Sequence, residues 1–90
     1  MATARLLVLD PAGLHARPAA RFVRTASRFA SRVTVRASDR TADAKSLIGL
    51  LTLTIRPGSE ITIEADGPDE SAAIEALIEE LGGAIERVAE

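Results

Sequence analysis

Hydrophobic residues repeat with two different periods along this chain, and the order of those periods restricts its fold more than any other feature. Apolar and polar residues alternate at 32–37 and 60–65, as expected of strands with one buried face. A short branched apolar run at 5–9 stops at an Asp-Pro pair and predicts a first strand. Residues 38–40 are typical of a tight turn and predict a hairpin into a short strand at 41–44. We therefore expect four strands.

Three other segments repeat at the helical period of about 3.6 residues. The first begins at Ala16, and its apolar positions are Ala16, Ala19, Ala20, Val23, Ala26 and Ala30. Ser46 precedes a short apolar segment at 47–51 and is a suitable N-cap for it. The last helix is predicted from Ile74, Leu77, Ile78, Leu81, Ile85 and Val88. The pair Gly82-Gly83 weakens its final turns, which we expect to fray.

The resulting order, βαββαβα, predicts one α+β domain over residues 1–90. We expect an open-faced β-sandwich, with a four-stranded antiparallel sheet and three helices on one face. The core should include Leu6 and Val8 from the first strand, and Leu50 and Leu53 from the short helix. Leu7 and Leu9 then lie on the open face of the sheet. That placement suits simple strand propensity and suits weak self-association equally well.

Composition excludes several classes of protein. The chain has no cysteine and one histidine, so neither a disulfide framework nor a thiolate or multi-histidine metal site is expected. Two phenylalanines are its only aromatic residues, which argues against nucleic-acid binding by base stacking. No apolar stretch approaches membrane-spanning length, and residues 1–5 lack the pattern of a signal peptide. We therefore expect a cytoplasmic protein without membrane insertion and without a cofactor.

The small net charge of −2 hides a strong asymmetry. Residues 1–56 carry ten basic and three acidic side chains, whereas residues 57–90 carry one basic and ten acidic ones. Four arginines recur on one face of the first predicted helix, at Arg17, Arg21, Arg24 and Arg28. They either form a basic face for an acidic or phosphorylated partner, or pair with the glutamate-rich last helix.

The single histidine, His15, stands at the entrance to the first helix. There the backbone N–H groups of Ala16 and Arg17 lack helical acceptors, and the positive end of the helix dipole favours an anion. A neutral imidazole at this position can accept a phosphoryl group, and the Arg17 guanidinium can pair with the new charge. Taken singly, His15 is more often an N-cap or a surface residue, and Arg17 a solvated charge. Taken together, in a chain with no other arrangement of a nucleophile and a base, the two residues favour the phosphoryl acceptor. No carboxylate flanks His15 in sequence, so a hydrolase triad has no support.

Two motifs resemble the family of HPr, the histidine-containing phosphocarrier protein of the bacterial phosphoenolpyruvate-dependent sugar phosphotransferase system. Gly13-Leu14-His15-Ala16-Arg17-Pro18-Ala19 is similar to the active-site motif, and Lys45-Ser46-Leu47-Ile48-Gly49-Leu50 to the motif around a regulatory serine. The resemblance extends over nearly the whole chain. It implies a carrier that takes a phosphoryl group on His15, at Nδ1, from phosphorylated enzyme I and passes it to enzyme II A domains. Such a protein is an intermediate of a relay rather than a free-standing catalyst.

The resemblance also implies a docking surface beside the site. Leu47, Ile48 and Leu51 are its expected apolar centre, because only one side of a short helix can face the sheet. Arg21, Arg24 and Arg28 are its expected basic rim. We expect a monomer that binds each partner transiently.

Ser46 matches the serine that a dedicated kinase, HPr kinase/phosphorylase, phosphorylates in some relatives, and other lineages keep this serine without such a kinase. A phosphate there adds roughly −1.5 to −2 charges beside the docking surface. Ile48 and Leu51 stand where kinase-regulated relatives often have methionine. Two alternatives to the sugar-uptake carrier remain: a regulatory, nitrogen-linked HPr paralogue, and a small non-catalytic α+β ligand-sensing or interaction module.

Overall fold

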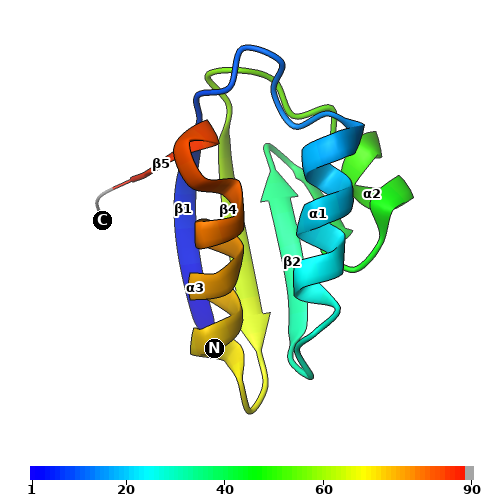
Figure 1. Ribbon diagram of the computed structural model, residues 1–90, viewed down its shortest axis with the longest axis vertical. Coiled ribbons are helices and arrows are strands. Elements are labelled where there is room, and N and C mark those ends of the chain that lie inside the picture. The colour runs from blue at the N-terminus through cyan, green and yellow to red at the C-terminus, as the bar shows by residue number, and fades with distance from the viewer. Residues whose placement is uncertain (89–90) are drawn as a thin grey trace.

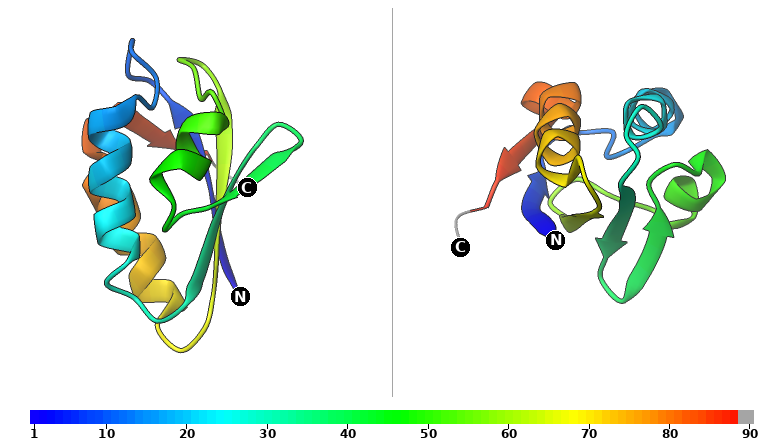
Figure 2. Two further views of the ribbon diagram at one scale, coloured as in Figure 1. Left: turned by 90° about the vertical axis from the view of Figure 1, so that its right-hand side faces the viewer. Right: turned by 90° about the horizontal axis from the view of Figure 1, so that it is seen from below.

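The computed structural model describes residues 1–88. Its strands are β1 (Ala2–Val8), β2 (Arg32–Ala37), β3 (Arg40–Asp43), β4 (Glu60–Asp66) and β5 (Ile85–Arg87). Its helices are α1 (Ala16–Ala26), α2 (Leu47–Thr52) and α3 (Glu70–Leu81), and a 3₁₀ turn, η1 (Gly82–Ala84), follows α3. The strands form one antiparallel sheet in the order β3-β2-β4-β1-β5. The α+β class and the open-faced arrangement are confirmed (Figures 1 and 2).

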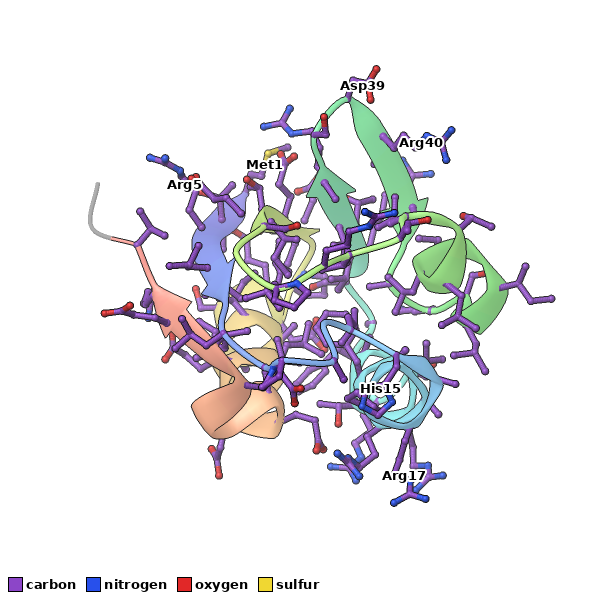
Figure 3. The ribbon with its side chains drawn as sticks, turned by 90° about the horizontal axis from the view of Figure 1, so that it is seen from above. Met1, Arg5, His15, Arg17, Asp39 and Arg40 are labelled. Atoms are coloured by element: carbon purple, nitrogen blue, oxygen red, sulfur yellow. The ribbon has the colours of Figure 1, made fainter. Side chains whose placement is uncertain are left out.

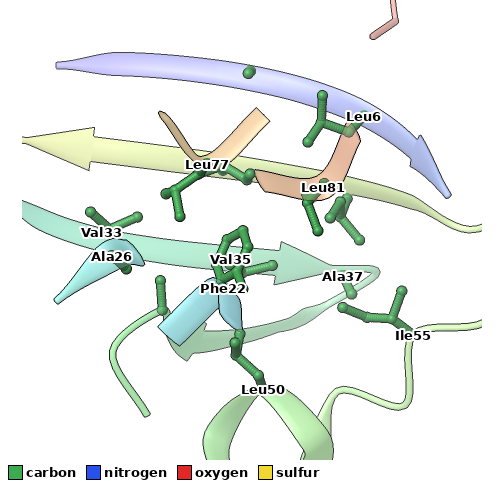
Figure 4. Close-up of a cluster of buried hydrophobic side chains, with 14 of the residues drawn as sticks. Leu6, Phe22, Ala26, Val33, Val35, Ala37, Leu50, Ile55, Leu77 and Leu81 are labelled. Carbon is green, nitrogen blue, oxygen red and sulfur yellow. The ribbon is translucent and has the colours of Figure 1, made fainter. Parts of the chain in front are cut away.

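α1 and α3 cover one face of the sheet side by side, and α2 lies next to α1 (Figure 2). The core forms between the helices and the inward side chains of the strands (Figure 4). Leu6 and Val8 are buried in it as predicted, and so are Leu50 and Leu53. Phe22 is the largest side chain in this layer and is 1% exposed. Burial of a side chain of this size stabilises a fold by about 1.5–3 kcal/mol.

The prediction of four strands was wrong, because the sheet has a fifth. Gly82 has φ 53°, a left-handed conformation that ends α3, so Ile85 and Val88 do not continue that helix. The chain turns back and β5 pairs with β1, with Leu7 opposite Glu86 and Val8 opposite Ile85. The backbone groups on the outer edge of β1 need partners, and this pairing supplies them for three residues.

Smaller corrections concern the ends of elements. β1 begins at Ala2 and stops before Leu9, β3 is shifted by one residue from 41–44, and α1 ends at Ala26. Ala30 and Arg28 therefore lie beyond the first helix. Leu7 is half-buried on the open face, opposite Glu60 in β4 and Glu86 in β5, while Leu9 lies after the strand and is 47% exposed.

Candidate functional site

The loop that leads into α1 is held by hydrogen bonds within the loop and by one to the backbone of residue 55. Within it, the Asp10 side chain accepts a hydrogen bond from the Ala12 N–H (2.8 Å), and the Asp10 carbonyl accepts one from Gly13 (2.8 Å). The Leu14 N–H donates to the Ile55 carbonyl at 3.2 Å. Gly13 has φ +68°, and a Cβ on it would stand 2.4 Å from the Ile55 oxygen. Glycine is therefore required where this loop passes the backbone of residue 55.

His15 occupies the N-cap position of α1, where its backbone is extended (φ −90°, ψ −176°). Its carbonyl accepts the first helical hydrogen bond, from Ala19 at 3.0 Å, but its side chain makes no cap hydrogen bond. The imidazole is exposed. Within residues 1–88, the N–H groups of Ala16 and Arg17 have no intramolecular acceptor, as expected for the first turn of a helix. The side chain and two backbone donors are thus available to a ligand at this helix end.

His15 and Arg17 line one pocket of about 340 Å³ beside the N-terminal end of α1. Figure 3 looks down on the N-terminal end of α1 and shows the side chains of His15 and Arg17 there. Arg21 and Glu80 also line the pocket, and its apolar wall includes Leu81 and Ile85. The Arg17 guanidinium and the helix dipole make this end of α1 favourable for a phosphate.

The four arginines in and just after α1 differ in their contacts. Arg21 Nε lies 3.7 Å from Glu80 Oε2 on α3, and Glu80 Oε1 accepts a hydrogen bond from the Thr25 hydroxyl at 3.0 Å. Within the described chain, Arg17, Arg24 and Arg28 form no ion pair, and all three side chains are exposed. The expected pairing with the last helix is therefore present at Arg21 alone.

Ser46 is the N-cap of α2, and its Oγ accepts a hydrogen bond from the Gly49 N–H at 3.0 Å. The cap predicted from sequence is confirmed. The exposed apolar side chains of α2 are Leu47 at 36%, Ile48 at 77% and Leu51 at 40%. Ser46 and these three side chains lie outside the lining of the His15 pocket, on the helix that packs beside α1.

Sequence patterns missed two contributors to the His15 site. The backbone of Ile55 supports the loop, and Ala84 with Ile85 forms part of the pocket wall. Both are more than 30 residues from His15, so no local spacing could have identified them. Among residues 1–88, no three His, Asp or Glu side chains gather as a metal site. The helices in this part of the chain lack the length and the apolar character of a membrane-spanning segment.

Residues 2–82 match the family model PTS-HPr, described as the PTS HPr component phosphorylation site. The chain belongs to the HPr family. It is 43% identical over 77 residues to the phosphocarrier protein HPr of Lysinibacillus sphaericus, covering 86% of this chain and 88% of that protein. The solved structure of the histidine-containing phosphocarrier protein of Mycoplasma is also similar, with a TM-score of 0.88, 38% identity and coverage of 89% and 91%.

A third relative is much longer than this chain. The Multiphosphoryl transfer protein of Xanthomonas campestris pv. campestris is 54% identical over 67 residues, which are 74% of this chain and 8% of that protein. This chain therefore spans a small fraction of that relative's length. Membership of the HPr family supports the general role of a phosphocarrier in the phosphotransferase system.

Proposed function

We propose that this HPr-family protein carries a phosphoryl group on His15, taking it from phosphorylated enzyme I and delivering it to enzyme II A domains in phosphoenolpyruvate-dependent sugar uptake. One observation carries the proposal. The only imidazole of the chain stands at a helix N-cap, exposed and unused for capping, and shares a pocket with Arg17. The alternative in which His15 merely caps the helix lacks the hydrogen bond that such a cap would make.

In the proposed transfer, Nδ1 of His15 attacks the phosphorus carried by enzyme I. The new N–P bond forms as the bond to the donor group breaks, and the donor keeps that electron pair. The N–H groups of Ala16 and Arg17, which have no acceptor within residues 1–88, would donate to the phosphoryl oxygens, and the Arg17 guanidinium would supply positive charge. Delivery to an A domain reverses the roles, with the imidazole as leaving group. The protein remains an intermediate of the relay.

The apolar side chains of Leu47, Ile48 and Leu51 are the proposed centre of the docking surface for both partners. Their exposure supports this role, since an apolar group on a six-residue helix gains by burial in a complex. Arg21, Arg24 and Arg28 are proposed to steer an acidic partner, and binding to enzyme I should weaken as salt rises. Arg24 and Arg28 are the more available of the three, because Arg21 lies beside Glu80.

Ser46 is the proposed site of regulation by HPr kinase/phosphorylase. Its Oγ lies at the N-terminal end of α2, next to Leu47 of the docking surface. A phosphate there would keep a favourable position on the helix dipole while adding negative charge beside the partner.

We further propose a monomer in the cytoplasm. Leu7 lies between two glutamates, which would disfavour self-association through that strip of the sheet.

The experiment is phosphorylation with phosphoenolpyruvate and a generic enzyme I. The wild type should gain an acid-labile, base-stable phosphate, His15→Ala should gain none, and Arg36→Ala, an exposed change on a strand away from the pocket, should match the wild type. A wild type that gains no phosphate contradicts the carrier function. A His15→Ala protein that gains as much as the wild type contradicts the site.

A second arm separates sugar uptake from nitrogen-linked regulation. The phosphorylated protein is offered sugar-specific A domains and a nitrogen-linked A domain under the same conditions. Faster delivery to the sugar-specific domains supports the proposed role, whereas faster delivery to the nitrogen-linked domain supports the regulatory paralogue.

A further inference from the structure

The segment after α3 lies against the loop that carries His15, although its residues 83–88 are outside the residues matched to the family. The family match ends at residue 82, and β5 covers Ile85–Arg87. The carbonyl of Ala84 accepts hydrogen bonds from the N–H groups of Leu9 (2.8 Å) and Asp10 (3.2 Å). Val88 N–H donates to the Arg5 carbonyl at 2.9 Å, so the segment is held at both ends of its pairing with β1.

These contacts are continuous with those that shape the site. Asp10, whose N–H is bound by Ala84, uses its side chain and its carbonyl to hold the N–H groups of Ala12 and Gly13. Gly13 in turn leads through Leu14 to His15. Ala84 and Ile85 also line the same pocket as His15 and Arg17. The segment thus contacts the site through the backbone of the loop and through the pocket wall.

We propose that residues 82–88, named here the C-terminal clasp, position the His15 loop for phosphoryl transfer. This inference rests on the proposed function of His15. The clasp residues that line the pocket, Ala84 and Ile85, present apolar side chains there, and the clasp holds the loop through its backbone, so it acts as a positioning element. Disruption of the pairing between the clasp and β1 should lower the kcat of enzyme I with this protein as phosphoryl acceptor. The KM for this protein should stay near its wild-type value. A displacement of about 1 Å at a reacting group can cost up to roughly 100-fold in rate.

The sharpest variant is Glu86→Pro. Residues 84 and 88 use their backbone groups toward β1, and positions two apart in a strand point the same way, so the Glu86 N–H also faces β1. Proline removes that N–H from the middle of a three-residue pairing. Glu86→Ala is the matched control, because it removes the exposed side chain and keeps the N–H.

A second pair of variants acts at the turn that sends the chain back to β1. Gly82 has φ 53° and Gly83 does not have a positive φ, while a Cβ on either would meet open space. Gly82→Val therefore disfavours the reversal through the backbone alone, and Gly83→Val is its control. This pair tests the clasp if the proline variant does not fold.

Two measurements are made on all four full-length variants. Amide hydrogen exchange at Leu9 and Asp10 should become about fivefold faster in Glu86→Pro and Gly82→Val, relative to the amides of β2 and β4, because a lost hydrogen bond is worth about 1 kcal/mol. In the same two variants kcat should fall about tenfold, with KM within about twofold of the wild type. Both controls should match the wild type in each measurement.

The outcomes are distinguishable from those of the proposed function. Faster exchange at Leu9 and Asp10 with unchanged kcat, or exchange that stays slow, would overturn the clasp as a positioning element. Unfolding of both test variants would also overturn it, by making the segment a requirement for the fold as a whole. A wild type that takes up no phosphate contradicts the proposed function, while the exchange experiment still reports whether the clasp holds the loop.

Discussion

Two helices of this protein begin at residues whose side chains are used in opposite ways. Ser46 at the start of α2 accepts a hydrogen bond from Gly49, so its Oγ serves the helix. His15 at the start of α1 makes no cap hydrogen bond, and its imidazole is exposed at the edge of a pocket. Both residues have extended backbones and both precede a helix, so their local geometry alone does not distinguish a structural cap from a chemical site.

The difference lies in what holds the helix end in place. α2 obtains its first hydrogen bond from its own N-cap side chain, whereas the loop before α1 is held by Ile55 on one side and Ala84 on the other. Distant backbone groups thus hold the loop before α1, and the His15 side chain makes no hydrogen bond to the helix. The proposed reactive side chain at the start of α1 is thus positioned by contacts from distant segments of the chain and not by its own hydrogen bonds.

The largest expected effect separates the two residues by function. His15→Ala should abolish phosphorylation by enzyme I and change the free energy of unfolding by less than about 0.5 kcal/mol, because the side chain makes no cap hydrogen bond. Radioactive phosphate uptake and urea unfolding measure the two quantities. A stability loss as large as that of a true cap would show that the histidine supports the helix after all.

The next effect tests the external support of α1. Gly13→Ala places a methyl group 2.4 Å from the Ile55 oxygen at φ +68°, and should cost about 2–4 kcal/mol of unfolding free energy. Phosphoryl uptake by the folded fraction should also fall, because the His15 loop must move. Gly58→Ala is the control for left-handed backbone without a close contact, since a Cβ there meets nothing within 4 Å. Equal losses at the two glycines would mean that the contact with Ile55 is unimportant.

Ser46→Ala should have the converse phenotype to His15→Ala. It removes the hydrogen bond to Gly49 and should cost about 1 kcal/mol, within the range of roughly 0.5–2 kcal/mol for N-cap serines. His15 should still take up phosphate. Ser27→Ala, an exposed serine that follows α1, is the control for loss of a hydroxyl, and its unfolding curve should overlay that of the wild type. Equal stabilities of Ser46→Ala and this control would show that the Ser46 hydroxyl does not stabilise α2 as a cap.

A third N-cap, Asp69 of α3, extends the comparison to pH. Its side chain does not cap its own helix but accepts hydrogen bonds from the Ala30 N–H (2.9 Å), the Ser31 N–H (2.9 Å) and the Ser31 hydroxyl. The Ser31 hydroxyl, followed by the Ala30 N–H, lowers the pKa of Asp69 below its ordinary value of 3.8. The stability from this ionised group is therefore present above about pH 3.8 and is lost as pH falls through the lower, folded-state pKa.

The corresponding variant should produce the smallest change. Asp69→Asn keeps an acceptor oxygen and removes the charge, so the melting temperature should decline less steeply below pH 4 than in the wild type. Asp39→Asn, in the exposed β2–β3 turn, controls for removal of one carboxylate. Melting curves between pH 2.5 and 7 measure the slopes, and parallel slopes in wild type and Asp69→Asn would show that this carboxylate does not contribute to acid sensitivity.

Most of the fold could be predicted because its signals are local. The alternation at 32–37 became β2 with the same bounds, and Ser46 became the cap of α2. The last helix was predicted too long because Ile85 and Val88 continue its period, and periodicity takes no account of a free strand edge elsewhere. The glycine pair is the available signal that the helix stops, but glycine predicts only a weakened helix end and does not specify that the chain reverses.

The sequence alone identified His15 as the only imidazole, its place at the start of a helix and Arg17 beside it, because these depend on residues within one turn. Tertiary structure decided that the His15 side chain is free, since the groups that hold its loop come from residues 55 and 84. It also decided that Arg21 lies beside Glu80 and that residues 85–87 form a strand. Such outcomes depend on which distant hydrogen-bonding groups the folded chain brings to an unsatisfied edge or loop, and no local pattern records them.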